Sequence, residues 1–150
     1  MASYKIPILL LIWNRTEHLE KLLLSIKEIK PKYIYVNADG PRPNKKDDIN
    51  KIESCKQIVK NLIDWECELK TNYSLNNQGC ALSVSKGITW FFKNVDKGII
   101  LEDDCIPHID YFSFAENLLE KYEFNEKVWC IGALNQQNGR IIGDGSYYLS

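Results

Sequence analysis

The chain has 150 residues, which is enough for one domain with a substantial core and too few for two ordinary domains. Hydrophobic residues make up 45% of the sequence and charged residues 26%, the balance of a soluble globular protein. The formal net charge of -1 excludes the strong positive field that draws proteins to nucleic acid or anionic membranes. The longest apolar run, Ile6 to Trp13, is interrupted by Pro7 and is too short to cross a bilayer.

The first residues lack the long apolar segment and small-residue cleavage site of a signal peptide. The cysteines are dispersed and form no C-x-x-C pair; they are Cys55, Cys67, Cys80, Cys105 and Cys130. An odd, dispersed set predicts buried free thiols in a reducing compartment, so we expect a cytoplasmic location. His18 should lie on the surface of an early helix, whereas His108 follows Asp104 closely enough to touch a site built there.

Apolar runs rich in Ile, Val and Leu alternate with segments of helical period, which predicts β-α-β units and a mostly parallel sheet. The first strand is expected from about Lys5 to Trp13, apolar nearly throughout because both of its faces are covered. Asn14 and Glu17 form a capping pair for the helix that follows, and Pro31 ends that helix. Its apolar positions recur at helical spacing: Leu19, Leu22, Leu23, Ile26 and Ile29.

A second strand, Tyr33 to Val36, leads into polar residues and a loop with two prolines. The second helix should bury Ile49, Ile52, Ile58, Val59, Leu62 and Ile63. A short strand is expected at Glu66 to Leu69. The third helix opens at the polar loop of residues 76–79 and should bury Ala81, Val84, Ile88, Phe91 and Phe92.

The fourth strand, Gly98 to Leu101, is compact and ends abruptly in three acids. A helix from about Asp110 to Tyr122 and a strand at Val128 to Ile131 follow, and the Gly-rich segment Asn138 to Ser150 predicts a hairpin or a connection. These elements predict a single α/β domain over residues 1–150. Its expected architecture is three-layered and Rossmann-like, with a mostly parallel sheet flanked by helices.

Glu102, Asp103 and Asp104 stand where ligands bind in open α/β sheets, outside the carboxyl ends of the strands. Adjacent carboxylates raise one another's pKa unless a cation or hydrogen-bond donors compensate. Mg²⁺ and Mn²⁺ prefer oxygen ligands, and Mg²⁺ typically binds one or two carboxylates, waters and substrate phosphates. If the strand geometry continues, residues 102 and 104 face one way and residue 103 the other, so one ion cannot bind all three.

The alternative is that these acids form a solvated turn or cap the following helix. Polar residues at two other strand ends favour a site, because Arg15 follows the first strand and Asp39 follows the second. Arg15 can meet a phosphate or carboxylate, and Asp39 can accept a hydrogen bond from a base or ribose donor. Each residue alone is more often a surface salt bridge or an Asx turn. Their expected convergence is what indicates function.

Five segments occur in the order of a known family and cover nearly all of the chain, and the segment with the EDD run is the most specific. They are Pro7 to Arg15 (PILLLIWNR), Tyr33 to Gly40 (YIYVNADG), Asn77 to Ala81 (NQGCA), Ile99 to Pro107 (IILEDDCIP) and Val128 to Asn135 (VWCIGALN). On these segments the chain resembles the GT-A glycosyltransferases. Within them it resembles the relatives of N-acetylglucosaminyltransferase I and the bacterial hemolytic-protein-like sugar transferases.

The resemblance implies the nucleotide-sugar-binding half of such an enzyme, with Mn²⁺ or Mg²⁺ and a nucleotide-diphosphate sugar, most often a UDP-sugar. Asp104 corresponds to the metal ligand. The implied nucleotide-sugar-binding residues are Asn14, Arg15, Asp39, Gln78, Gly79, Glu102 and Asp103. The chain departs from the pattern at Asn14, where relatives often carry Asp. It also stops at Ser150, before the acceptor-binding half and the catalytic base of such enzymes, so no catalytic residue is assigned.

The implied reaction is metal-dependent transfer of a sugar to an acceptor hydroxyl of a glycan, lipid or protein, with inversion. An alternative is a non-catalytic or truncated module that binds nucleotide sugar without turning it over. A phosphoryl-transfer enzyme is disfavoured because there is no G-x-x-x-x-G-K-[ST] loop. A dinucleotide-binding domain is disfavoured because the first strand leads into Trp13 to Thr16 without a glycine fingerprint. A sheet edge left open by truncation would favour self-association.

Overall fold

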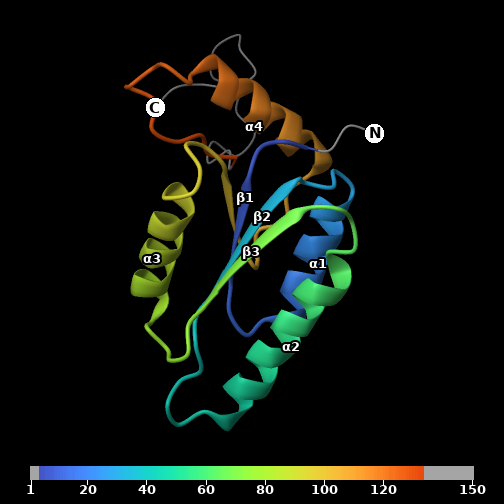
Figure 1. Cartoon of the computed structure of the whole chain (residues 1–150), viewed down its shortest axis with the longest axis vertical. Coiled ribbons are helices and arrows are strands. Elements are labelled where there is room, and N and C mark those ends of the chain that lie inside the picture. The colour runs from blue at the N-terminus through green and yellow to red at the C-terminus, as the bar shows by residue number, and fades with distance from the viewer. Residues whose placement is uncertain (1–3, 134–150) are drawn as a thin grey trace, which may run out of the picture.

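The computed structural model describes residues 4–133. Within them, four parallel strands form one sheet in the order β3-β2-β1-β4 (Figure 1). Strands and helices alternate along the chain from β1 to α4, and helices cover both faces of the sheet. The α/β class and the Rossmann-like three-layer architecture expected from the sequence are therefore confirmed.

The strands are β1 (Ile8–Ile12), β2 (Tyr33–Ala38), β3 (Glu68–Tyr73) and β4 (Ile99–Glu102). β1 lies between β2 and β4, and Leu10 is the partner of both Val36 and Leu101. All five residues of β1 are buried, as expected for a strand covered on both faces. β3 ends four residues later than predicted, because this edge strand has the polar sequence ELKTNY and lacks an apolar signal.

The helices are α1 (Thr16–Lys27), α2 (Lys46–Leu62), α3 (Cys80–Phe92) and α4 (Ile109–Lys121). α1 ends before Pro31, as predicted, but the predicted capping pair of Asn14 and Glu17 is wrong. Arg15 is the residue at the N-cap and makes no capping hydrogen bond with its side chain. The side chain of Asn14 instead donates to Asp48 on the neighbouring helix, at 3.0 Å.

The helices divide between the two faces of the sheet. α1 and α2 pack on one face and α3 on the other, as Figure 1 shows. α4 joins the α1 side through Phe112 and Ala115. The residues of β1 alternate between the two layers: Ile8, Leu10 and Ile12 face α1, whereas Leu9 and Leu11 face Phe91 of α3. Because all strand pairs are parallel, the carboxyl ends of the four strands lie at one edge of the sheet.

Several predicted burial positions are wrong. Ile49 of α2 is 58% exposed and Phe92 of α3 is 45% exposed. The buried side of α3 carries Ser83 and Gly87 together with Phe91, and the helix approaches β2 closely at Gly87. A Cβ atom at Gly87 would lie 2.7 Å from Cγ of Asn37. The apolar pattern therefore identified the helix and misjudged which of its residues the sheet would cover.

The segment after α4 also differs from the prediction. Val128 to Ile131 is not a strand; it follows a turn in which Val128 N donates to the Asn125 carbonyl, and Trp129 is 92% exposed. Within the described residues it pairs with no strand of the sheet. All five cysteines are free, as predicted, but of these only Cys55 is buried and Cys80, Cys105 and Cys130 are exposed. The hairpin predicted at Asn138 to Ser150 lies outside the described residues.

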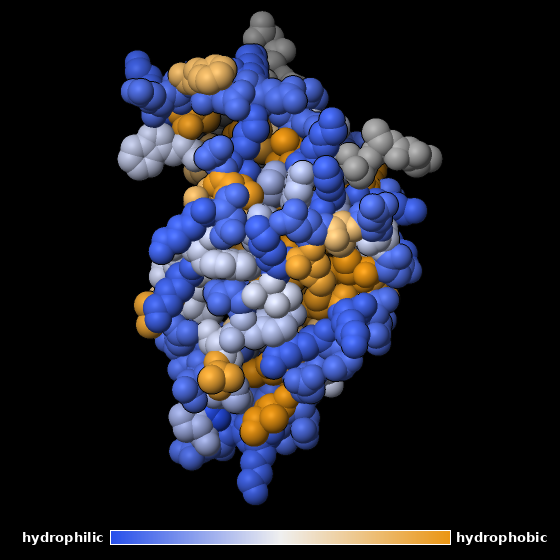
Figure 2. Space-filling model, in the orientation of Figure 1, coloured by the Kyte–Doolittle hydropathy of each residue, from blue (hydrophilic) through white to orange (hydrophobic). Residues whose placement is uncertain are grey.

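No helix in residues 4–133 is both long enough and apolar enough to cross a bilayer. The face of the molecule in Figure 2 is mostly hydrophilic and carries separate apolar patches, some of them near α4 at the top of the view. Self-association through an open sheet edge stays a prediction.

Candidate functional site

The strand order defines where a ligand is expected to bind. Along the chain, β2 and β3 are added on one side of β1, and β4 then returns to the other side. The order reverses between β1 and β4, and in open α/β sheets ligands bind at such a switch point, beyond the carboxyl ends of the strands. Arg15 follows β1, and Asp103 and Asp104 follow β4. The candidate residues of these two strands therefore meet at the switch point.

Arg15 brings the two aspartates together. Its Nη1 lies 2.6 Å from Oδ2 of Asp104 and 3.3 Å from Oδ1 of Asp103. The expectation that residues 103 and 104 would face opposite ways is wrong, because the strand alternation stops at Glu102. There the chain turns, and the amide of Cys105 donates to the Glu102 carbonyl at 3.0 Å. The turn places two carboxylates on one cationic group.

The pKa values of these two acids shift in opposite directions, because one acid is buried and the other is exposed. Asp103 is buried, and desolvation raises its pKa, although the charge of Arg15 opposes this rise. Asp104 is exposed, and the hydrogen bond from Arg15 lowers its pKa. The same hydrogen bond raises the pKa of Arg15, so the pair Arg15–Asp104 is charged at neutral pH. The site combines one exposed, ionised carboxylate with one buried carboxylate beside it.

Trp13 connects this cluster to the end of β2. Its backbone amide donates to Oδ2 of Asp103 at 3.3 Å, and its indole Nε1 donates to the carbonyl of Gly40 at 3.1 Å. Gly40 approaches the loop before α3 so closely that a Cβ atom there would lie 2.5 Å from the backbone of Asn76. Hydrogen bonds and backbone contact thus join the ends of β1, β2 and β4 to the loop that precedes α3.

Asp39 is fully engaged within this network. Its Oδ1 accepts from the amides of Gly40 and Gln78, and its Oδ2 accepts from the Asn77 side chain and the Gly79 amide, at 2.8 to 3.1 Å. These donors occupy the acceptor positions of the carboxylate. Gly79 has φ of +82°, a conformation that glycine adopts readily, and it immediately precedes α3. Asp39 thus fixes the loop before α3 through hydrogen bonds to residues 77–79.

A second Arg–Asp pair was missed by sequence reasoning. Asp48, at the start of α2, is almost fully buried and accepts from Nε and Nη2 of Arg42 at 2.7 and 2.9 Å. Arg42 also lies over the indole of Trp13, with 4.8 Å between Cζ and the ring centroid. The hydrogen bonds from Arg42 lower the pKa of Asp48. The only sequence signal for this pair was the position of Arg42 in the loop with two prolines between Gly40 and α2.

The other predicted residues lie near the network with different partners. Glu102 is exposed at the end of β4. The side-chain amide of Gln78 donates to Ser74 at 2.7 Å and accepts from Lys86 at 2.6 Å, which holds it against its own loop. His108 is exposed and caps α4 by accepting from the amide of Asp110. The structure does not bring His108 to the two aspartates.

The carboxylate oxygens of Asp103 and Asp104 suit a hard divalent cation, but they come from only two residues. No group of three or more His, Cys, Asp or Glu side chains within residues 4–133 is arranged to hold a metal ion. Two carboxylates that already converge on a cationic nitrogen match the one or two protein ligands that Mg²⁺ commonly uses, with waters and phosphates completing its shell. Asp104, ionised and exposed, and Asp103 beside it are the residues that could hold such an ion.

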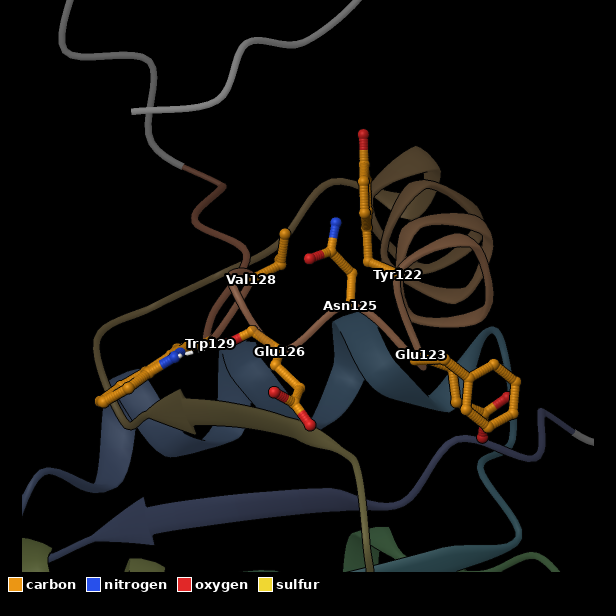
Figure 3. Close-up of a pocket in the computed structure, with 7 residues that line it drawn as sticks. Tyr122, Glu123, Asn125, Glu126, Val128 and Trp129 are labelled. Atoms are coloured by element: carbon orange, nitrogen blue, oxygen red, sulfur yellow. Dashed lines mark hydrogen bonds between the residues drawn. The ribbon is translucent and has the colours of Figure 1, made fainter.

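Two hollows of the surface lie elsewhere. One, of about 560 Å³, is lined by residues 122–126, 128 and 129 after α4. Figure 3 shows Tyr122 and Asn125 pointing to one side of it and Trp129 pointing away, held by its hydrogen bond to the Glu126 carbonyl. The other, of about 550 Å³, runs between β4 and α4 and includes Ile100. Neither is lined by Arg15, Asp103 or Asp104.

Comparison of the chain with protein-family models and with curated proteins finds no match.

Proposed function

We propose that this chain binds a nucleotide-diphosphate sugar together with Mn²⁺ or Mg²⁺ and serves in glycosyl transfer to an acceptor hydroxyl. The observation that carries the proposal is the convergence of Arg15, Asp103 and Asp104 at the switch point between β1 and β4. This edge offers carboxylates for a cation and a guanidinium for a phosphate, the two charges that a metal–diphosphate complex requires. The resemblance of the EDD segment to the GT-A enzymes directs the choice of ligand class.

The residues have separate roles in this proposal. Asp104 holds the cation and Asp103 supports it from its partly desolvated position, while Arg15 donates to the diphosphate. Trp13 fixes the position of Asp103 through its backbone amide. Glu102 is exposed at the tip of β4, and we assign it to the sugar hydroxyls. When bound, the cation supplies Lewis-acid stabilisation of the charge on the departing nucleotide.

Thermal unfolding with UDP-sugars tests the proposal. A UDP-sugar should raise the Tm of the full chain in the presence of Mn²⁺ and leave it unchanged in EDTA, because ligands that bind only the folded state stabilise it. At a ligand concentration of 100 times Kd the gain is about 2.7 kcal/mol. Asp104→Ala should remove the gain. Glu120→Gln, an exposed acid on α4, is the control and should keep it.

An increase in Tm that persists unchanged in Asp104→Ala would count heavily against a cation site at this residue. Hydrolysis of the donor then separates the enzyme from the binding module. Release of free sugar from a UDP-sugar, dependent on Mn²⁺ and lost in Asp104→Ala, favours catalysis. Binding without any release favours the non-catalytic alternative.

A further inference from the structure

Two arginine–aspartate contacts at the carboxyl end of the sheet differ in how firmly they hold the guanidinium. Arg42 contacts Asp48 through two nitrogens, and the side chain of that carboxylate is 3% exposed. Arg15 contacts both of its aspartates through Nη1 alone, and the side chains of Asp103 and Asp104 are 10% and 47% exposed; the shorter contact is the one to the exposed Asp104. A two-point contact with a buried carboxylate fixes a guanidinium, whereas a single-atom contact at the surface is readily exchanged.

The backbone of Arg15 is fixed although its side chain is loosely held. Its carbonyl accepts from the amide of Leu19 at 3.1 Å, the first hydrogen bond of α1. The side chain can therefore move without disturbing the helix. Among the described residues, Nε and Nη2 of Arg15 have no hydrogen-bond partner, and these groups are available to an anion. One guanidinium thus contacts two acids and retains unused donors.

We infer that Arg15 is an exchangeable internal counterion for the cation site, an inference that rests on the proposed function. Without ligand, the single positive charge of Arg15 partly balances the charge of Asp103 and Asp104. A divalent cation competes for the same oxygens, and two positive groups at one point repel each other. When a diphosphate arrives with the cation, Arg15 leaves the carboxylates and donates to the diphosphate. The cation alone therefore binds weakly, and the cation and the nucleotide strengthen each other's binding by the same factor.

Calorimetric titration of the full chain with Mn²⁺ alone, with UDP alone and with both tests this coupling. Arg15→Gln should bind Mn²⁺ alone about two- to fivefold more tightly than the wild type, the worth of an exposed ion pair. UDP should raise the Mn²⁺ affinity of the wild type, and the rise should be smaller in Arg15→Gln. Arg42→Gln removes the same charge at the same end of the sheet and should bind Mn²⁺ alone no more tightly than the wild type.

Arg15→Lys keeps a positive charge beside the two acids and should bind Mn²⁺ alone as weakly as the wild type. The counterion role is overturned if Arg15→Gln binds Mn²⁺ alone no more tightly while the wild type still binds Mn²⁺ with UDP; the proposed function then stands. It is also overturned if Arg15→Lys or Arg42→Gln tightens Mn²⁺ binding as much as Arg15→Gln does. A wild-type chain that binds no UDP at any Mn²⁺ concentration overturns the proposed function and this inference together.

Discussion

Asp39, just beyond β2, holds Gly79 at the start of α3: its Oδ2 accepts from the Gly79 amide at 3.1 Å across 40 positions of sequence. The same carboxylate accepts from the amides of Gln78 and Gly40 at 2.8 Å. These bonds set the course of the chain into α3 and keep the loop against the end of β2. Asp39, which the resemblance assigns to nucleotide binding, thus stabilises the loop before α3 in the free protein.

Asp39→Asn should destabilise the fold, because the amide has one acceptor oxygen, whereas the carboxylate has two oxygens that accept from four donors. The expected loss is about 1–3 kcal/mol, the range for leaving buried polar groups unsatisfied. Urea unfolding followed by tryptophan fluorescence measures it. Asp47→Asn, at an exposed acid in the first turn of α2, is the control. Full stability of Asp39→Asn combined with lost nucleotide binding would show that Asp39 serves the ligand and not the loop.

Gly40→Ala should also destabilise the fold, because the added Cβ atom would lie 2.5 Å from backbone carbon of Asn76. Backbone cannot yield as a flexible side chain does, so we expect a loss of about 1–3 kcal/mol, the range for overpacking. Gly132→Ala is a matched control, since a Cβ atom there meets nothing within 4 Å. Equal stability of the two variants in urea unfolding would show that the loop before α3 moves away at little cost.

Asp48 should make stability depend on pH. Its pKa is lowered by the hydrogen bonds from Arg42, below the unfolded value of about 3.9. The unfolded state therefore binds a proton more readily, and the contribution of Asp48 is fully present above about pH 5 and is lost as the pH falls further. The Tm of Asp48→Asn should lie below that of the wild type at pH 7, and the gap should narrow toward pH 3. A gap that is constant with pH would mean that the substitution acts through packing.

Asp103 should change the stability with pH in the direction opposite to Asp48. Burial raises its pKa, so the folded state binds the proton more readily and stability falls as the pH rises through the folded-state pKa. At pH 7 the ionised Asp103 carries a desolvation penalty that Asn does not carry. Asp103→Asn should therefore have a Tm at pH 7 equal to or above that of the wild type, while its Mn²⁺-dependent stabilisation by a UDP-sugar is lost. A lower Tm in calorimetry would show that the contact with Arg15 outweighs the cost of burial.

The order and type of the elements up to α4 could be predicted because buried parallel strands are apolar throughout. β1 and β4 stand out as compact runs of Ile and Leu. β3 was placed too early because an edge strand carries few apolar residues. Val128 to Ile131 has strand-like composition, yet within the described residues it pairs with no strand of the sheet. Local composition signals a propensity, whereas pairing depends on what lies alongside.

The candidate site, like the fold, could be predicted from the sequence only in part. The sequence by itself determined that polar residues would follow three strands of a parallel sheet and so share one edge, since the carboxyl ends of parallel strands lie together. Only the tertiary structure decided the partners: the turn after Glu102 turned Asp103 and Asp104 toward Arg15, and the loop before α3 took up Asp39. Hydrogen bonds extend about 3 Å and are directional, so a single backbone turn decides which side chains come within bonding distance of each other.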